Sequence, residues 1–175
     1  MPAENTEPEF CFDAAVIARL IPHAGRMQLL AGVVSISPDS IECAATSHTD
    51  PGNPLRSAGR LHAIVAAEYA AQAAAAHSAL AGREDPSAIQ NTQAQKQGVL
   101  AVLSNVVWRA PQLDDIAGRL HIRATRLAKL GAGFQYRFEV GELNSLPDHA
   151  RVTGELIVAF RSNDTPPRSS HKTPD

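Results

Sequence analysis

The sequence predicts an α+β fold in which a curved antiparallel sheet of about six strands wraps around one long central helix. Two observations lead to this prediction. The segment from about residue 60 to 81 is dominated by alanine, contains neither Gly nor Pro, and is apolar nearly all round, so a helix formed there has to be buried. Six segments with strand character flank it, two before and four after.

The part of the chain before the long helix supplies a short helix and a hairpin. DAAVIARLIP, residues 13–22, predicts the short helix, with Asp13 as its N-cap. MQLLAGVVSIS (27–37) and SIECAATS (40–47) predict two strands, joined by the turn residues at 38–39.

The part after the long helix supplies four strands, which follow a polar loop at 82–97. Apolar and polar residues alternate from Leu120 to Thr125 and again from Phe134 to Val140, so one face of the sheet is apolar. A sheet of this kind that curls around one buried helix is the hot-dog arrangement. The four strands are expected at 98–110, 118–130, 133–142 and 150–160.

The length of 175 residues fits one domain, expected at residues 10–161. Residues 1–9 and 162–175 are rich in Pro, Ser, Thr and charge, and are expected to be disordered. An open sheet has exposed edges, and hot-dog folds commonly pair through one of them, so we expect a dimer.

Composition excludes several classes of function. A net charge of −2 and a pI near 6.4 offer no basic surface for nucleic acid, and the alanine-rich segment is too weakly hydrophobic to span a membrane. The acidic start of the chain is not a signal peptide, and two cysteines without a disulfide pattern suit the cytoplasm. Nucleotide-binding glycine motifs and metal-ligand spacings are absent from the sequence, which favours a mechanism without cofactor or metal.

Glu68 is the exceptional residue of the alanine-rich helix. It shares a predicted helical stripe with Leu61, Val65, Gln72 and Ala76, and burying a carboxylate there is costly unless it is paired or protonated. One interpretation is a general acid or base. The other is structural, with Glu68 at a subunit interface or bonded to Gln72 or a loop amide.

Two histidines are candidate catalytic partners of this carboxyl. His62 lies near the predicted helix start, where free N–H groups favour an oxygen that gains negative charge. Six residues separate it from Glu68, so the two side chains cannot meet within one helix but could meet across a dimer. His48 closes the second strand and could equally be a loop histidine. His77 is expected to be a core or interface histidine, and His23 to order the start of the first strand.

Two motifs resemble the β-hydroxyacyl-acyl-carrier-protein dehydratases. LIPHAGRMQLLAGVV is similar to their L-P-H-R-x-P-(F/M)-L-L-(L/V)-D-x-V, and AAEYAAQA to their I-E-(A/Y)-M-A-Q-A. The E-Y-x-A-Q-A core, followed by an alanine run and His77, is most similar to the subgroup associated with aryl polyene synthesis. The resemblance spans nearly the whole predicted domain and implies a hot-dog dimer.

The resemblance also implies roles for single residues. The helix carboxyl that protonates the leaving hydroxyl corresponds to Glu68, and the glutamine that accompanies it to Gln72. The family's loop histidine, fourteen residues before the carboxyl, corresponds to Pro54, so this chain departs from the pattern at the residue that abstracts the proton. Either His48 or His62 replaces that histidine, or proton abstraction is absent.

The expected reaction is therefore removal of water from a 3-hydroxyacyl thioester carried by acyl carrier protein or coenzyme A, as in fatty acid or polyene biosynthesis. Amides near Ala63 and Ile64 would hold the thioester oxygen. Two alternatives stay open. Hot-dog folds also include thioesterases that activate water with a carboxyl on the same helix, and the missing loop histidine fits a non-catalytic acyl-binding subunit. The expected partner is a second hot-dog subunit, identical or different.

Overall fold

The computed structural model describes residues 9–81 and 98–160, except 132, 144–145 and 147–148. The predicted polar loop at 82–97 and the predicted disordered ends, apart from the exposed Glu9, lie outside the described residues. The elements are β1 (Phe12–Asp13), α1 (Ala14–Leu20), the 3-10 turn η1 (Gly25–Met27), β2 (Gly32–Ile36), β3 (Ser40–Ala45), the 3-10 turn η2 (Ala63–Val65), α2 (Ala66–Leu80), β4 (Gly98–Trp108), β5 (Leu120–Leu130), β6 (Gly133–Glu142) and β7 (Val152–Phe160).

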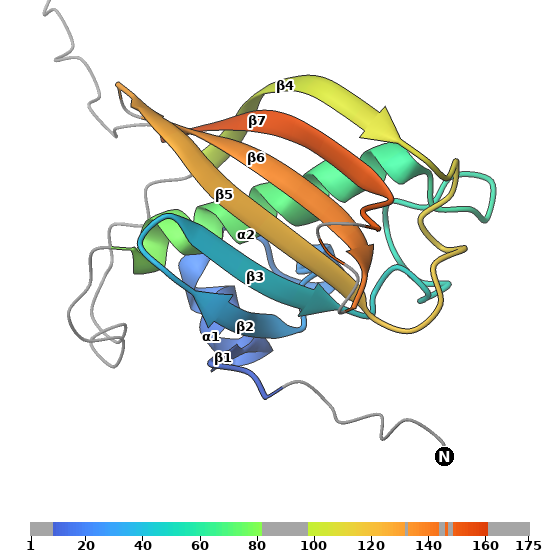
Figure 1. Cartoon of the computed structure of the whole chain (residues 1–175). Coiled ribbons are helices and arrows are strands. Elements are labelled where there is room, and N and C mark those ends of the chain that lie inside the picture. The colour runs from blue at the N-terminus through green and yellow to red at the C-terminus, as the bar shows by residue number, and fades with distance from the viewer. Residues whose placement is uncertain (1–8, 82–97, 132, 144–145, 147–148, 161–175) are drawn as a thin grey trace, which may run out of the picture.

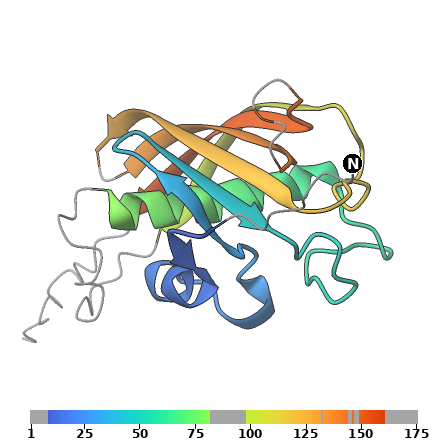
Figure 2. The same cartoon turned by 60° about the horizontal axis from the view of Figure 1, so that its bottom comes forward.

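One antiparallel sheet curves around α2. Its strand order is β1-β2-β3-β5-β6-β7-β4, so the strand that follows the helix forms one edge and the first hairpin lies toward the other. Figure 1 shows α2 running beneath the concave face of the sheet, and the turned view of Figure 2 shows α1 on the far side of the helix from the sheet. This is the predicted architecture, with the six predicted strands and one more.

The additional strand is β1, which the sequence analysis did not predict. It has only two residues, Phe12 and Asp13, which pair with Val33 and Gly32 of β2. Asp13 is also the N-cap of α1, as predicted, because its carboxylate accepts a hydrogen bond from the backbone N–H of Val16 at 3.0 Å. A pairing this short is set by tertiary contact and leaves no periodic signal in the sequence.

The long helix begins later than the predicted start near residue 60. The backbone of residues 61–63 is used by a distant segment: Leu61 O accepts from Leu113 N at 2.7 Å, and Ala63 N donates to Pro111 O at 3.0 Å. Helical hydrogen bonds cannot form there at the same time, so the chain turns through η2 and α2 starts at Ala66. The predicted strand at 27–37 likewise shortens to β2, because side-chain hydrogen bonds from the helix hold Met27 and Leu29.

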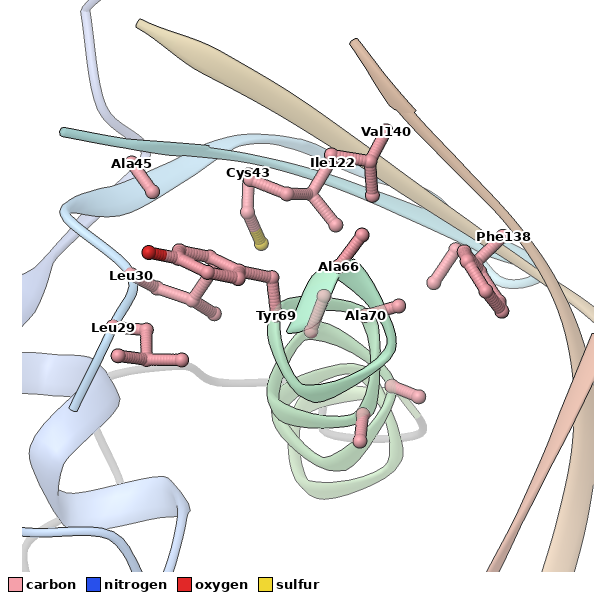
Figure 3. Close-up of a cluster of buried hydrophobic side chains, with 14 of the residues drawn as sticks. Leu29, Leu30, Cys43, Ala45, Ala66, Tyr69, Ala70, Ile122, Phe138 and Val140 are labelled. Carbon is pink, nitrogen blue, oxygen red and sulfur yellow. The ribbon is translucent and has the colours of Figure 1, made fainter. Parts of the chain in front are cut away.

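The core lies between α2 and the concave face of the sheet. The alanines of α2 are buried and small, which lets the helix approach the sheet closely, while the strands contribute most of the large side chains. In Figure 3, Ala66 and Ala70 face the sheet residues Ile122 and Phe138. Tyr69 is the largest buried side chain of the helix, and it points toward Leu29 and Leu30 of the segment before β2.

Candidate active site

Glu68 lies in the first turn of α2 and reaches the molecular surface. Its side chain is 26% exposed, whereas most of the helix around it is buried. One turn later, Gln72 donates a hydrogen bond from Nε2 to Glu68 Oε1 at 3.0 Å, which is the i,i+4 geometry of a helix. The carboxyl is therefore oriented by its own helix and open to solvent on one side.

Gln72 is fully buried and uses its whole amide. Besides the bond to Glu68, its Nε2 donates to Met27 O at 2.8 Å, and its Oε1 accepts from Leu29 N at 3.0 Å. Reversing the amide would place oxygen against two oxygens and N–H against N–H, so the network fixes its orientation. Gln72 thereby ties the segment before β2 to the turn of helix that carries Glu68.

His23 is the histidine that the fold brings to Glu68. It lies between α1 and η1, in the segment that Gln72 holds, and its Nε2 is 3.1 Å from Glu68 Oε1. Its side chain is 27% exposed, close to the value for Glu68. From the sequence, His23 was expected to order the start of the first strand and was not among the candidate site residues. The structure makes it the neighbour of the candidate acid.

His62 lies at the N-cap of η2 with an extended backbone and an exposed ring. Within one chain the described contacts of Glu68 are with Gln72 and His23, so His62 and Glu68 are not brought together. Of the two proposed oxyanion amides, that of Ala63 donates to Pro111 O. Ile64 lies in the turn where backbone N–H groups have no helical acceptor, and its side chain is 47% exposed.

His48 is enclosed in the protein. Its ring has no exposed surface, and Nε2 donates to the backbone carbonyl of Ile116 at 3.0 Å. Burial lowers the pKa of His48, which favours the neutral ring. The structure therefore places His48 as a link between two loops rather than on the surface that Glu68 reaches.

The loop that carries Pro54 is held by its own hydrogen bonds. Pro54 is exposed, while Asn53 before it is buried, donates to Ser47 O and Tyr69 Oη, and accepts from Leu55 N. Arg56 donates to three backbone carbonyls of the same loop and to Asp114 at 3.1 Å. Pro54 itself has no titratable side chain, and the loop around it is held in place by these hydrogen bonds.

A metal-binding cluster and a membrane-spanning helix are both absent from the described residues. Within residues 9–81 and 98–160, His, Cys, Asp and Glu form no group of three or more that could hold a metal ion. The same part of the chain has no helix that is long and apolar enough to cross a membrane.

Comparison with known families identifies the family of this chain. The sequence profile of the ApeP-like family, described as ApeP dehydratase, matches residues 15–154. The chain belongs to the ApeP-like family. The resemblance to hot-dog dehydratases is thus confirmed, and it is consistent with the aryl polyene subgroup. Among curated proteins, none matches this chain in sequence.

Solved structures share the fold of this ApeP-like chain. The dehydratase heterocomplex ApeI:P from Xenorhabdus doucetiae has a TM-score of 0.68 at 21% identity, with 84% of this chain and 91% of that chain covered. Zebra fish thioesterase superfamily member 2 has a TM-score of 0.55 at 15% identity, covering 85% and 95%. AziG from S. sahachiroi has a TM-score of 0.53 at 17% identity, covering 82% and 99%. These matches confirm the hot-dog fold.

His23 is the site residue that the sequence analysis missed. One signal was available, because His23 belongs to the LIPHAGRM motif and Glu68 to the AAEYAAQA motif, the two stretches that carry the family resemblance. Two such motifs pointing to one site would have predicted that they meet. The segment that follows His23 is bonded to Gln72, and the two hydrogen bonds that Gln72 makes with Met27 and Leu29 could not be read from spacing.

Proposed function

We propose that this chain takes part in the removal of water from 3-hydroxyacyl thioesters, with Glu68 as the acid. In this reaction a base takes a proton from the carbon next to the thioester, the C–O bond at the next carbon breaks, and Glu68 gives its proton to the leaving hydroxyl as water forms. The observation that carries the proposal is a partly exposed carboxyl in the first turn of α2, oriented by Gln72, in a dehydratase family.

The base is proposed to come from another subunit. Within the described residues, the loop position of Pro54 has no base and the ring of His48 is enclosed, whereas His62 is exposed. Two sources of the base are therefore proposed. One is His62, acting together with Glu68 of a second copy of the chain, and the other is a histidine of a different hot-dog partner. The ApeI:P neighbour is a heterocomplex, which supports the second possibility by analogy.

The edge strand β4 supports pairing with such a partner. Among the described strands it ends the sheet, so one side of its backbone has no strand partner there, and it exposes Val102, Val107 and Trp108 at 46%, 56% and 54%. An edge of this length with apolar side chains is suited to a second subunit. We further propose the cytoplasm as the location, in keeping with two unpaired cysteines, Cys11 and Cys43.

The test is the identity of the product. The chain, alone and with a co-purified hot-dog partner, is incubated with a 3-hydroxyacyl-coenzyme A, and both ultraviolet absorbance of an enoyl thioester and release of free thiol are recorded. Dehydration predicts the enoyl thioester with no thiol. Thiol release would instead identify a thioesterase, and no product from either preparation would leave only a binding role.

The contribution of Glu68 is tested with a matched pair of variants. Glu68→Gln is expected to lower turnover by about 100-fold or more, because the amide N–H is not acidic enough to protonate the leaving hydroxyl. Glu139→Gln is the control, since Glu139 is 23% exposed, like Glu68, but lies on β6 next to Arg123. It is expected to leave turnover unchanged. Equal turnover in the two variants would refute the role of Glu68.

A further inference from the structure

The two oxygens of the Glu68 carboxyl have different surroundings. Oε1 accepts the hydrogen bond from Gln72 at 3.0 Å and lies 3.1 Å from His23 Nε2. Among the described residues, none makes a hydrogen bond or ion pair with Oε2. The partly exposed side chain therefore has one oxygen engaged by the protein and one available to a ligand.

The surroundings of His23 indicate which of its nitrogens carries the proton. Nδ1 is buried and has no hydrogen-bond partner in the part of the chain that the structure describes. A neutral imidazole has one N–H and one acceptor nitrogen, and a buried N–H without an acceptor is rarer in proteins than an unused acceptor. The proton of the neutral ring is therefore assigned to Nε2, which donates to Glu68 Oε1.

Gln72 sets this geometry from the helix. Its bonds to Met27 O and Leu29 N fix the segment after His23, and its remaining N–H fixes Glu68. Gln72 is thus one of the two donors to Oε1, and it also bonds to the backbone that follows the other donor, His23. The arrangement is preorganised, because neither donor has to be ordered when a substrate arrives.

We propose that His23 is a positioning residue for the dehydration, an inference that rests on the proposed function. Its Nε2–H and the amide of Gln72 together hold Oε1, so that Oε2 is the oxygen that gives its proton to the leaving hydroxyl. Because the nitrogen facing the site already carries a proton, His23 does not take the proton from the substrate carbon. That proton goes to a base of the other subunit.

Two substitutions separate positioning from proton transfer. His23→Gln keeps a side-chain N–H near the place of Nε2 but cannot act as a base, whereas His23→Phe keeps the ring volume and removes the donor. With the partner subunit present, His23→Phe is expected to lower kcat about 10- to 100-fold with KM and Tm unchanged, as expected for a misplaced reacting group. His23→Gln is expected to recover most of kcat.

Two outcomes of this experiment would overturn the inference. If His23→Gln is as inactive as His23→Phe, the ring itself transfers a proton. If His23→Phe keeps the full kcat, the contact with Glu68 has no role in the reaction.

A measurement that needs no turnover tests the hydrogen bond by itself. Nitrogen-15 NMR of the histidine rings in the wild type is expected to show His23 with its proton on Nε2, and Glu68→Gln is expected to shift that Nε2 signal. A proton on Nδ1 would overturn the assignment. If the wild type forms no enoyl thioester, the proposed function fails, and the ring signals still decide whether His23 donates to Glu68.

Discussion

Two polar clusters include residues of α2 and each contains a histidine, but they differ in exposure and in how far their hydrogen bonds are completed. The Glu68 cluster consists of Glu68, Gln72 and His23, and the His77 cluster of His77, Ser78 and Tyr136. In the His77 cluster, His77 accepts from Tyr136 Oη at Nδ1 and donates to a backbone carbonyl from Nε2, each at 2.9 Å. The ring has no exposed surface, so its hydrogen-bonding capacity is complete inside the protein.

The Glu68 cluster differs in both respects. Glu68 and His23 are about one-quarter exposed, and within the described residues Glu68 Oε2 and His23 Nδ1 have no partner. The Glu68 side chain is partly exposed, so its unpartnered oxygen can be reached by a ligand. A polar residue of the alanine helix is therefore structural where it is buried and all its hydrogen bonds are made. It is a functional candidate where one hydrogen-bonding atom has no partner and the side chain reaches the surface.

The largest expected effect is the loss of turnover in Glu68→Asp. Glu68→Asp shortens the side chain by one methylene, so its carboxyl can no longer keep the bond to Gln72 and the same reach toward substrate. We expect turnover with the partner subunit to fall about 100-fold, since a displacement of about 1 Å can cost that much. Steady-state kinetics measure it. Turnover within about twofold of wild type would show that the bond to Gln72 does not orient the acid.

Substitutions in the His77 cluster are expected to lower the free energy of unfolding. His77→Ala removes two buried hydrogen bonds and leaves a cavity, and should lower the free energy of unfolding by about 2–3 kcal/mol. Tyr136→Phe removes only the hydroxyl and should cost about 1 kcal/mol. Urea denaturation measures both. A His77→Ala variant as stable as wild type would mean that the His77 cluster does not hold the fold together.

A smaller effect is the dependence of stability on pH. Burial lowers the pKa of His77, His48 and His121 from the ordinary value of 6.5. As pH falls below 6.5, the unfolded chain takes up protons that the folded chain does not, so the free energy of unfolding decreases with falling pH. Each such histidine contributes a slope of up to about 1.4 kcal/mol per pH unit.

The pH dependence of unfolding also tests the state of His77. Denaturation of His77→Ala between pH 7.5 and 5.5 should give a slope smaller than that of wild type by about one proton. An unchanged slope would contradict the neutral, buried state of His77.

Local patterns predicted most of the fold. The α1 cap at Asp13, the six longer strands and the buried alanine helix all follow from periodicity and capping, which depend on neighbouring residues. What could not be predicted depends on distant parts of the chain. The pairing of residues 61–63 with 111–113 delays the helix, and the β1 pairing needs Val33 in place.

The residues of the candidate site were likewise predicted where local spacing identifies them and missed where distant contacts do. Glu68 was evident as a charge in an apolar helix, and Gln72 was evident as its i+4 neighbour. His23 was missed because its contact spans 45 residues and depends on how Gln72 holds the intervening backbone. His62 was chosen because it lies near the predicted helix start, and His48 because it closes the second predicted strand. Within one chain, neither ring is in contact with Glu68.

The most direct test of the account measures both properties on both clusters. Turnover per folded molecule and free energy of unfolding are determined for Glu68→Gln and His77→Ala, each with the partner subunit. We predict that Glu68→Gln loses about 100-fold or more in turnover with stability within about 0.5 kcal/mol of wild type, and that His77→Ala does the reverse. Retained turnover in Glu68→Gln, or a loss of turnover in His77→Ala as large as that in Glu68→Gln, would contradict the assignment of chemistry to one cluster and structure to the other.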